Sequence, residues 1–192
     1  MFWTALAYLS YTRRCPLVTP HKKEVTVELS PDWDFVADTV MGGVSDGAVT
    51  KTVIDGRDAT RLTGTVSLEN NGGFIQMVSD LGESGEVLDA RRWAGLELDV
   101  TGNGEVYDLR LRTDQLTRPW QSFRAEFLAQ EGWRRLRIPF YSFKPNKTEA
   151  AFDPGRIRRI GILAVGREFE ADVAVAALRF YRSSAAPDAD RP

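Results

Sequence analysis

Apolar and polar side chains alternate at every second position along several stretches of the chain. The clearest stretches are residues 96–100, 107–112 and 123–127, where apolar residues are interleaved with acidic or basic ones. Successive side chains of a β-strand point to opposite faces, so this pattern is typical of strands with one buried face. Turns containing Asp-Gly, Asn-Gly, Gly-Asn-Gly or proline separate further strand candidates, at residues 47–54, 58–68, 73–79, 133–139, 157–165 and 171–182.

Many short strands joined by such turns predict an all-β domain in which two antiparallel sheets pack face to face. The body of the chain shows no sustained helical period and no internal repeat. With 192 residues the chain suits one domain, and a body of about 150 residues buries roughly 70% of its unfolded surface. We therefore expect one β-sandwich over residues 30–182.

The two ends of the chain lack this alternation. Residues 1–29 are expected to be an N-terminal extension, and residues 183–192 a disordered tail. Residues 1–23 contain no Asp or Glu, begin apolar and then turn basic, which leaves a targeting peptide and a disordered arm as open interpretations. The charge order is wrong for a secretory signal, and the apolar run is too short and polar to span a membrane.

The composition excludes several classes of function. Lys and Arg number 25 against 27 Asp and Glu, so the net charge of −2 implies no bulk attraction to nucleic acid or anionic membranes. The only cysteine and the only histidine, Cys15 and His21, precede the expected domain. Triads that need an imidazole and Cys-rich or His-rich metal sites are therefore excluded from it. Nucleotide-binding glycine motifs are absent as well, so we expect no cofactor, no metal and no catalytic residue.

Two glycine pairs lie between strand candidates, one in residues 38–45 (Asp-Thr-Val-Met-Gly-Gly-Val-Ser) and one in residues 69–74 (Glu-Asn-Asn-Gly-Gly-Phe). Glycine there allows a positive φ or a close approach of another chain segment, and Asp or Ser side chains hydrogen-bond to nearby backbone. We interpret the following residues as structural turn residues: Asp38, Gly42, Gly43, Ser45, Gly72 and Gly73.

These two segments belong to an ordered series of motifs. The series continues from Trp33-Asp34-Phe35 through both glycine segments to Gly95-Leu96-Glu97-Leu98, Gly102-Asn103-Gly104, Leu111-Arg112-Thr113, Ile138-Pro139-Phe140 and Phe143. It resembles the complex I intermediate-associated protein 30 family over residues 31–182. The resemblance implies a galactose-binding-domain-like jelly roll, and it implies a role in assembling NADH:ubiquinone oxidoreductase. Two features depart from the family pattern: Asn103 replaces an acidic residue, and the segment before residue 30 has no counterpart.

Arg110 and Arg112 occupy polar positions of the strand candidate 106–112. If this strand pairs with residues 96–100 across the Gly-Asn-Gly turn, the two arginines form ordinary salt bridges with Glu97 and Asp99. In the alternative interpretation they grip an anion or carboxylate.

Besides the two arginines, two further groups of residues are candidates for contacts with a ligand or partner. Trp120 and Gln121 lie in the loop after the arginine strand, where an exposed aromatic would serve as an anchor or a stacking platform. Asn70 and Asn71 are either turn residues that tolerate left-handed backbone or rim residues that bind a polyol or a partner backbone. The predicted binding residues are therefore Arg110, Arg112, Trp120, Gln121, Asn70 and Asn71.

The resemblance implies a non-enzymatic binding module that holds an assembly intermediate or an unfolded client through one face of the sandwich. The expected partner is a protein, with respiratory complex I subunits as candidates, and the expected location is the bacterial cytoplasm or the mitochondrion. A carbohydrate-binding jelly roll is the alternative. A hydrolase that uses two carboxylates ranks third, because the acidic residues mostly occupy outward strand positions or turns.

Overall fold

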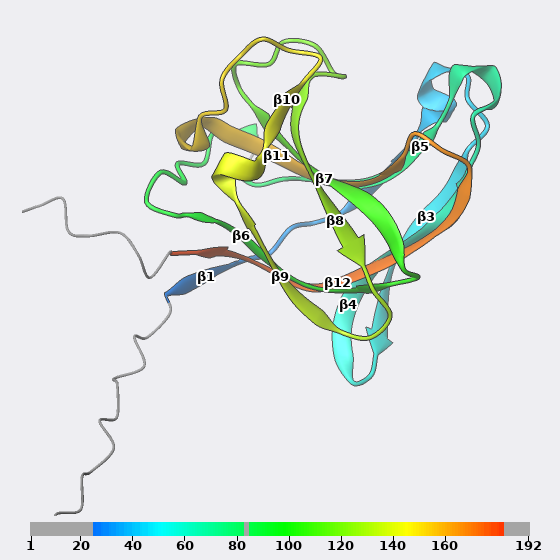
Figure 1. Cartoon of the computed structure of the whole chain (residues 1–192), viewed down its shortest axis with the longest axis horizontal. Helices are drawn as coiled ribbons and strands as arrows, with labels where there is room; N and C mark the ends of the chain where they lie inside the picture. The colour runs from blue at the N-terminus through cyan, green and yellow to red at the C-terminus, as the bar shows by residue number, and fades with distance from the viewer. Residues whose placement is uncertain (1–24, 83–84, 183–192) are drawn as a thin grey trace, which may run out of the picture.

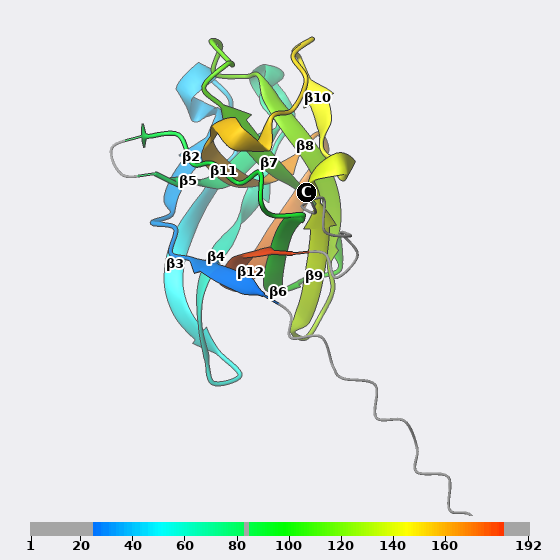
Figure 2. The same ribbon diagram turned by 90° about the vertical axis from the view of Figure 1, so that its left-hand side faces the viewer.

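Two antiparallel β-sheets pack face to face in the computed structural model, which describes residues 25–82 and 85–182 (Figures 1 and 2). This arrangement confirms the predicted all-β sandwich. The expected tail and most of the expected extension lie outside the described residues.

The first sheet, sheet A, follows the order β3–β4–β12–β6–β9. Its strands are β3 (Asp46–Ile54), β4 (Arg57–Val66), β12 (Phe169–Tyr181), β6 (Gly95–Gly102) and β9 (Arg134–Pro139). The long strand β12 pairs with β4 through residues 169–175 and with β1 (Thr26–Leu29) through residues 178–181.

The second sheet, sheet B, follows the order β10–β8–β7–β11–β5–β2. Its strands are β10 (Lys144–Asn146), β8 (Ser122–Ala129), β7 (Glu105–Thr113), β11 (Ile157–Val165), β5 (Phe74–Asp80) and β2 (Asp34–Ala37). Short 3-10 segments occur in the connections: η1 (Asp38–Met41), η2 (Glu69–Asn71), η4 (Phe140–Ser142) and η5 (Pro154–Arg156).

The core between the sheets is built from every second residue of the strands. Leu62 and Phe180 of sheet A are buried against the inward residues of sheet B, among them Ile75, Tyr107 and Phe123. Removal of such side chains from water is the main stabilising term of a sandwich. The residues between them point to the outer face of each sheet, and these two outer faces are where charged side chains gather.

The strands β6 and β7 are not neighbours in one sheet, so the predicted pairing of Glu97 and Asp99 with the arginines of β7 is wrong. β6 lies in sheet A and β7 in sheet B. In the turn between them, the Gly104 N–H donates to the Ala129 carbonyl of β8 (2.8 Å), and the Asn103 N–H donates to the Asp172 carbonyl of β12 (3.1 Å). The turn therefore crosses between the sheets. A hairpin within one sheet and a connection that crosses from one sheet to the other both use a tight glycine turn, so the sequence does not distinguish them.

Asn103 fills the position where the family pattern has an acidic residue. Its Oδ1 accepts a hydrogen bond from the Tyr107 hydroxyl (2.8 Å), and its Nδ2 donates to the Glu170 carbonyl (2.7 Å). The Tyr107 hydroxyl in turn accepts from the Asp172 N–H, and burial raises the pKa of Tyr107 to about 12. An amide supplies both the acceptor and the donor that this turn uses, whereas a carboxylate would lack the donor.

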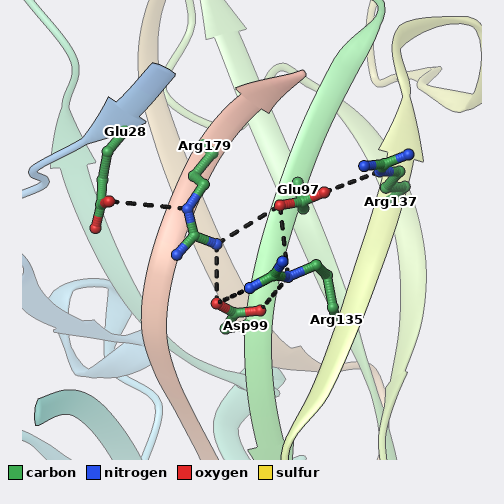
Figure 3. Close-up of polar contacts among 6 residues, drawn as sticks. All are labelled: Glu28, Glu97, Asp99, Arg135, Arg137 and Arg179. Atoms are coloured by element: carbon green, nitrogen blue, oxygen red, sulfur yellow. Dashed lines mark hydrogen bonds and ion pairs between the residues drawn. The ribbon is translucent and has the colours of Figure 1, made fainter. Parts of the chain in front are cut away.

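Outward side chains of sheet A form an ion-pair network across the strands β1, β12, β6 and β9 (Figure 3). Its members are Glu28, Glu97, Asp99, Arg135, Arg137 and Arg179. Asp99 accepts hydrogen bonds from Arg135 (2.7 Å) and Arg179 (2.8 Å), which lower its pKa against the opposing effect of burial. Arg137 pairs with Glu97 at 2.8 Å. Three carboxylates face three guanidinium groups, so the charges of this network balance one another.

The strands β1, β2 and β10 are short and were not predicted from the alternation. β1 falls within residues 1–29, which the sequence pattern assigns to the extension. Three of its four residues are exposed, so it pairs through its backbone and has no apolar period to reveal it. β10 contains Pro145, which lacks an N–H group and suits the edge of a sheet.

Candidate functional site

The Asp38 carboxylate joins the two glycine segments at one end of the sandwich. Asp38 is fully buried. Its Oδ1 accepts from the Ser45 N–H (3.0 Å), and its Oδ2 accepts from the Ser45 hydroxyl (2.5 Å), the Gly73 N–H (2.6 Å) and the Phe74 N–H (3.2 Å). Burial alone would raise the pKa of Asp38, but these hydrogen bonds outweigh it and hold the pKa below the usual value of 3.8. We call Asp38 and these bonds the Asp38 clamp.

The glycines around the clamp are needed for two different reasons. Gly42 and Gly73 have positive φ angles of 90° and 128°, which favour glycine. Gly43 and Gly72 are not in that region. A Cβ on Gly43 would lie 2.3 Å from Asp38 Oδ1, and one on Gly72 would lie 2.5 Å from Asp38 Oδ2. These two glycines therefore make room for the carboxylate.

Asn70 and Asn71 lie beside the clamp in η2 and have left-handed backbone, with φ of 55° and 58°. Both side chains are exposed. They precede Phe74, at the end of β5 farthest from Asp80. Asp80 is at the level of Arg159 and Arg112 in the sheet register, and the strand rise of about 3.3 Å per residue separates the two ends by roughly 20 Å. The structure thus does not bring the asparagines together with the predicted arginine site.

The outer face of sheet B carries a row of paired charges on β7 and β8. Asp108 is almost completely buried, with 4% of its side chain exposed, and it pairs with Arg110 (2.9 Å) and Arg124 (3.4 Å). Arg124 also pairs with Glu126. Arg110 therefore has a local partner and supports the salt-bridge interpretation at this position, although the partner differs from the one predicted.

Arg112 lies on the same outer face but forms no ion pair with a carboxylate of the described residues. Its Nη2 donates to the Arg118 carbonyl (3.0 Å), whereas its Nε is buried without a hydrogen-bond partner in this part of the chain. Burial, together with the nearby positive charges of Arg159 and Arg158, lowers the pKa of Arg112. A buried donor without an acceptor is unfavourable by about 1–3 kcal/mol. The Arg112 guanidinium thus carries a positive charge that no carboxylate of the described residues pairs with.

Trp120 and Gln121 adjoin Arg112 through the loop between β7 and β8. The carbonyl oxygen of Arg118 accepts the hydrogen bond from Arg112, and the Arg118 guanidinium carbon lies over the Trp120 ring, 5.9 Å from its centroid. The Gln121 Oε1 accepts from the Arg118 N–H (3.0 Å), so its side chain shapes this loop. Trp120 is 54% exposed. The structure therefore brings Arg112, Trp120 and Gln121 together, and we call these three residues the Arg112 corner.

Carboxylates of the described residues form no cluster that could hold a metal ion. No group of three or more metal-ligating side chains occurs among them. The carboxylates with a shifted pKa, namely Asp38, Asp80, Asp89, Asp99 and Asp114, are all shifted downward. A glycosidase acid requires a raised pKa, so these shifts give the hydrolase hypothesis no support. The described residues also contain no helix of the length and apolarity that a membrane crossing requires.

Solved structures of carbohydrate-binding modules share this fold. A family 11 module from Clostridium thermocellum, in complex with a β-1,3-1,4-mixed-linked tetrasaccharide, is similar with a TM-score of 0.65 and 13% identity over 82% of this chain and 96% of that one. A family 30 module of a Clostridium thermocellum cellulosomal cellulase is similar with a TM-score of 0.61 and 14% identity, over 83% and 99% of the two chains. At such identities the likeness shows the fold alone.

Sequence comparison gives a more specific result. No individual curated protein matches the chain significantly. The family model of complex I intermediate-associated protein 30 matches residues 22–174, which is most of the chain and includes both glycine segments and the β7 arginines. The chain therefore belongs to the complex I intermediate-associated protein 30 family.

Proposed function

We propose that this protein is a non-catalytic binding module that holds a protein assembly intermediate, with the Arg112 corner of sheet B as its contact surface. Family membership supports a partner among the assembling subunits of NADH:ubiquinone oxidoreductase. The compartment would follow that partner, in the bacterial cytoplasm or the mitochondrion.

The single observation that carries this proposal is the state of Arg112. Its guanidinium pairs with no carboxylate of the described residues, whereas the neighbouring arginines Arg110 and Arg159 have carboxylate partners at 2.9 and 2.7 Å. A carboxylate of a bound partner at the solvent-exposed part of the Arg112 side chain would neutralise this positive charge. Hydrogen bonds to charged groups contribute about 1.5–3 kcal/mol, so the interaction would favour binding measurably.

Trp120 adds apolar contact area next to this cation. Tryptophan and arginine are enriched among the residues that dominate protein interfaces. On the outer face of sheet A, by contrast, the ion-pair network in Figure 3 has as many carboxylates as guanidinium groups, so its charges already neutralise one another. Sheet B is therefore the better candidate for the contact surface.

Carbohydrate binding is the competing function. Sugar rings stack on flat aromatic side chains, which jelly rolls present on a sheet face. The outward positions of β7, β8 and β11 carry charged, small or aliphatic residues, and neither Trp nor Tyr. Trp120 is the aromatic candidate beside this face, and it is shared by both hypotheses.

We expect Arg112→Ala and Trp120→Ala each to reduce partner capture by about tenfold or more, as truncation of interface anchors does. Folding should be preserved, because Arg112 is only part-buried and Trp120 is more than half exposed. The measurement is affinity purification from the native cell followed by mass spectrometry, with thermal unfolding of each variant alongside.

Matched controls are available on other surfaces. Arg134 is an exposed arginine of β9, and Tyr141 of η4 is 90% exposed. Arg134→Ala and Tyr141→Ala should capture as much partner as the parent. Equal capture of the protein partner by all four variants would contradict the proposed surface. If the parent instead binds members of a glycan panel, and Arg112→Ala or Trp120→Ala abolishes that binding, the carbohydrate alternative is favoured.

A further inference from the structure

Large apolar side chains are exposed on the two turns that the Asp38 clamp joins. Val40 and Met41 of η1 are 72% and 67% exposed, and Val44 and Leu68 are 45% and 47% exposed. The segments η1 and η2 lie side by side at one end of the molecule, at the upper right in Figure 1. We call these four residues the apolar tip.

The clamp holds the apolar tip in one conformation. The Ser45 hydroxyl, which donates its proton to Asp38 Oδ2, accepts a hydrogen bond from the Ser67 N–H (3.0 Å), and this bond fixes Val44 and Leu68 on adjoining backbones. The Gly42 and Gly43 amides donate to the Thr39 and Asp38 carbonyls, both at 3.1 Å, and close the turn that carries Val40 and Met41. An exposed apolar group on a rigid turn binds without a further ordering cost, which is the basis of preorganised recognition.

Charge around the tip distinguishes between possible occupants. Residues 38–46 and 67–72 contain the exposed carboxylates Asp46 and Glu69 and the buried Asp38 but no Lys or Arg, and Glu168 accepts a hydrogen bond from the Leu68 N–H at 3.4 Å. Arg167, the nearby cation, is engaged with Glu105 and the Phe169 ring. An acidic rim repels anionic membrane surfaces and attracts basic protein segments.

We propose that the apolar tip is a second docking surface, which binds an apolar protein segment flanked by Lys or Arg. Exposed apolar groups rimmed by polar ones mark interaction sites, and methionine adapts to varied apolar partners. This surface is separate from the Arg112 corner, which lies toward the other end of sheet B by its register.

The test uses the full chain and two fluorescent peptides that share one apolar core, flanked in one by lysines and in the other by glutamates. Fluorescence anisotropy should show the lysine-flanked peptide binding at least about tenfold more tightly, because charge complementarity discriminates against the wrong partner. The double substitution Val40→Ser, Met41→Ser should weaken that binding by about tenfold or more. The control Val53→Ser changes a similarly exposed valine, 64% exposed on β3, and should leave the affinity within about twofold of the parent.

A charge variant keeps the test independent of the apolar substitutions. Glu69→Lys alters an exposed residue of η2 and should weaken binding of the lysine-flanked peptide severalfold. Arg112→Ala should leave peptide binding unchanged, which separates this surface from the proposed function. Equal binding of both peptides, an equal loss in Val53→Ser, or binding to phosphatidylcholine or phosphatidylglycerol vesicles without peptide binding would each overturn the proposal.

Discussion

Replacing Asp38 with alanine should lower the free energy of unfolding at pH 7 by about 3 kcal/mol or more, because three backbone amides lose their acceptor and each buried donor left without one costs about 1–3 kcal/mol. The substitution deprives the Ser45, Gly73 and Phe74 amides and the Ser45 hydroxyl of their shared acceptor. Urea unfolding measures the loss. The control is Asp89→Ala, which removes an exposed carboxylate paired with exposed Arg91 and should change stability by less than about 1 kcal/mol.

The stability difference between the parent and Asp38→Ala should depend on pH. The pKa of Asp38 is lowered in the folded protein from the usual 3.8, so ionised Asp38 stabilises the fold above that value. This contribution is lost as the pH falls through the lower, folded pKa. The difference in unfolding free energy between the parent and Asp38→Ala should therefore narrow below about pH 4. A difference that stays constant down to pH 2 would mean that the carboxylate charge does not hold the turns.

Gly43→Ala should destabilise the protein by about 1–3 kcal/mol, the range typical of an added methyl group in a tightly packed site. Gly43 does not need a positive φ, so the penalty arises because the new Cβ would lie 2.3 Å from Asp38 Oδ1 and displace the carboxylate. In the Asp38→Ala background the contacts with Oδ1 and Cγ, at 2.3 and 2.4 Å, are gone, although the Cβ of residue 38 stays 2.8 Å away. The same glycine substitution should then cost less than it does in the parent, and this non-additivity identifies the contact. Equal costs in the two backgrounds would contradict it.

Much of the fold could be predicted because one face of each long strand is buried. The alternation at Leu96, Leu98 and Val100 follows directly from their position between the sheets. The assignment of strands to sheets could not be predicted in the same way. Gly102 and Gly104 permit a hairpin or a crossing equally, and the choice depends on bonds to Ala129 and Asp172, which are distant in sequence.

The candidate site was predictable only in outline. The outward position of Arg112 follows from strand alternation, but its lack of a carboxylate partner among the described residues depends on which side chains the neighbouring strands β8 and β11 bring nearby. The ion-pair network of sheet A was missed, although the outward alternation of Arg135 and Arg137 along β9 signals a charged face. The exposure of Val40 and Met41 had no sequence signal, because apolar residues next to a glycine turn are commonly buried.

Hydrogen exchange of the full chain, alone and in complex with its captured protein partner, tests most directly whether sheet B is the binding face. We expect slower exchange in peptides from residues 105–129, which include β7, β8 and the loop of the Arg112 corner, and no change in residues 95–102 and 134–139 of sheet A. Slower exchange confined to β6 and β9, with residues 105–129 unchanged, would contradict the account.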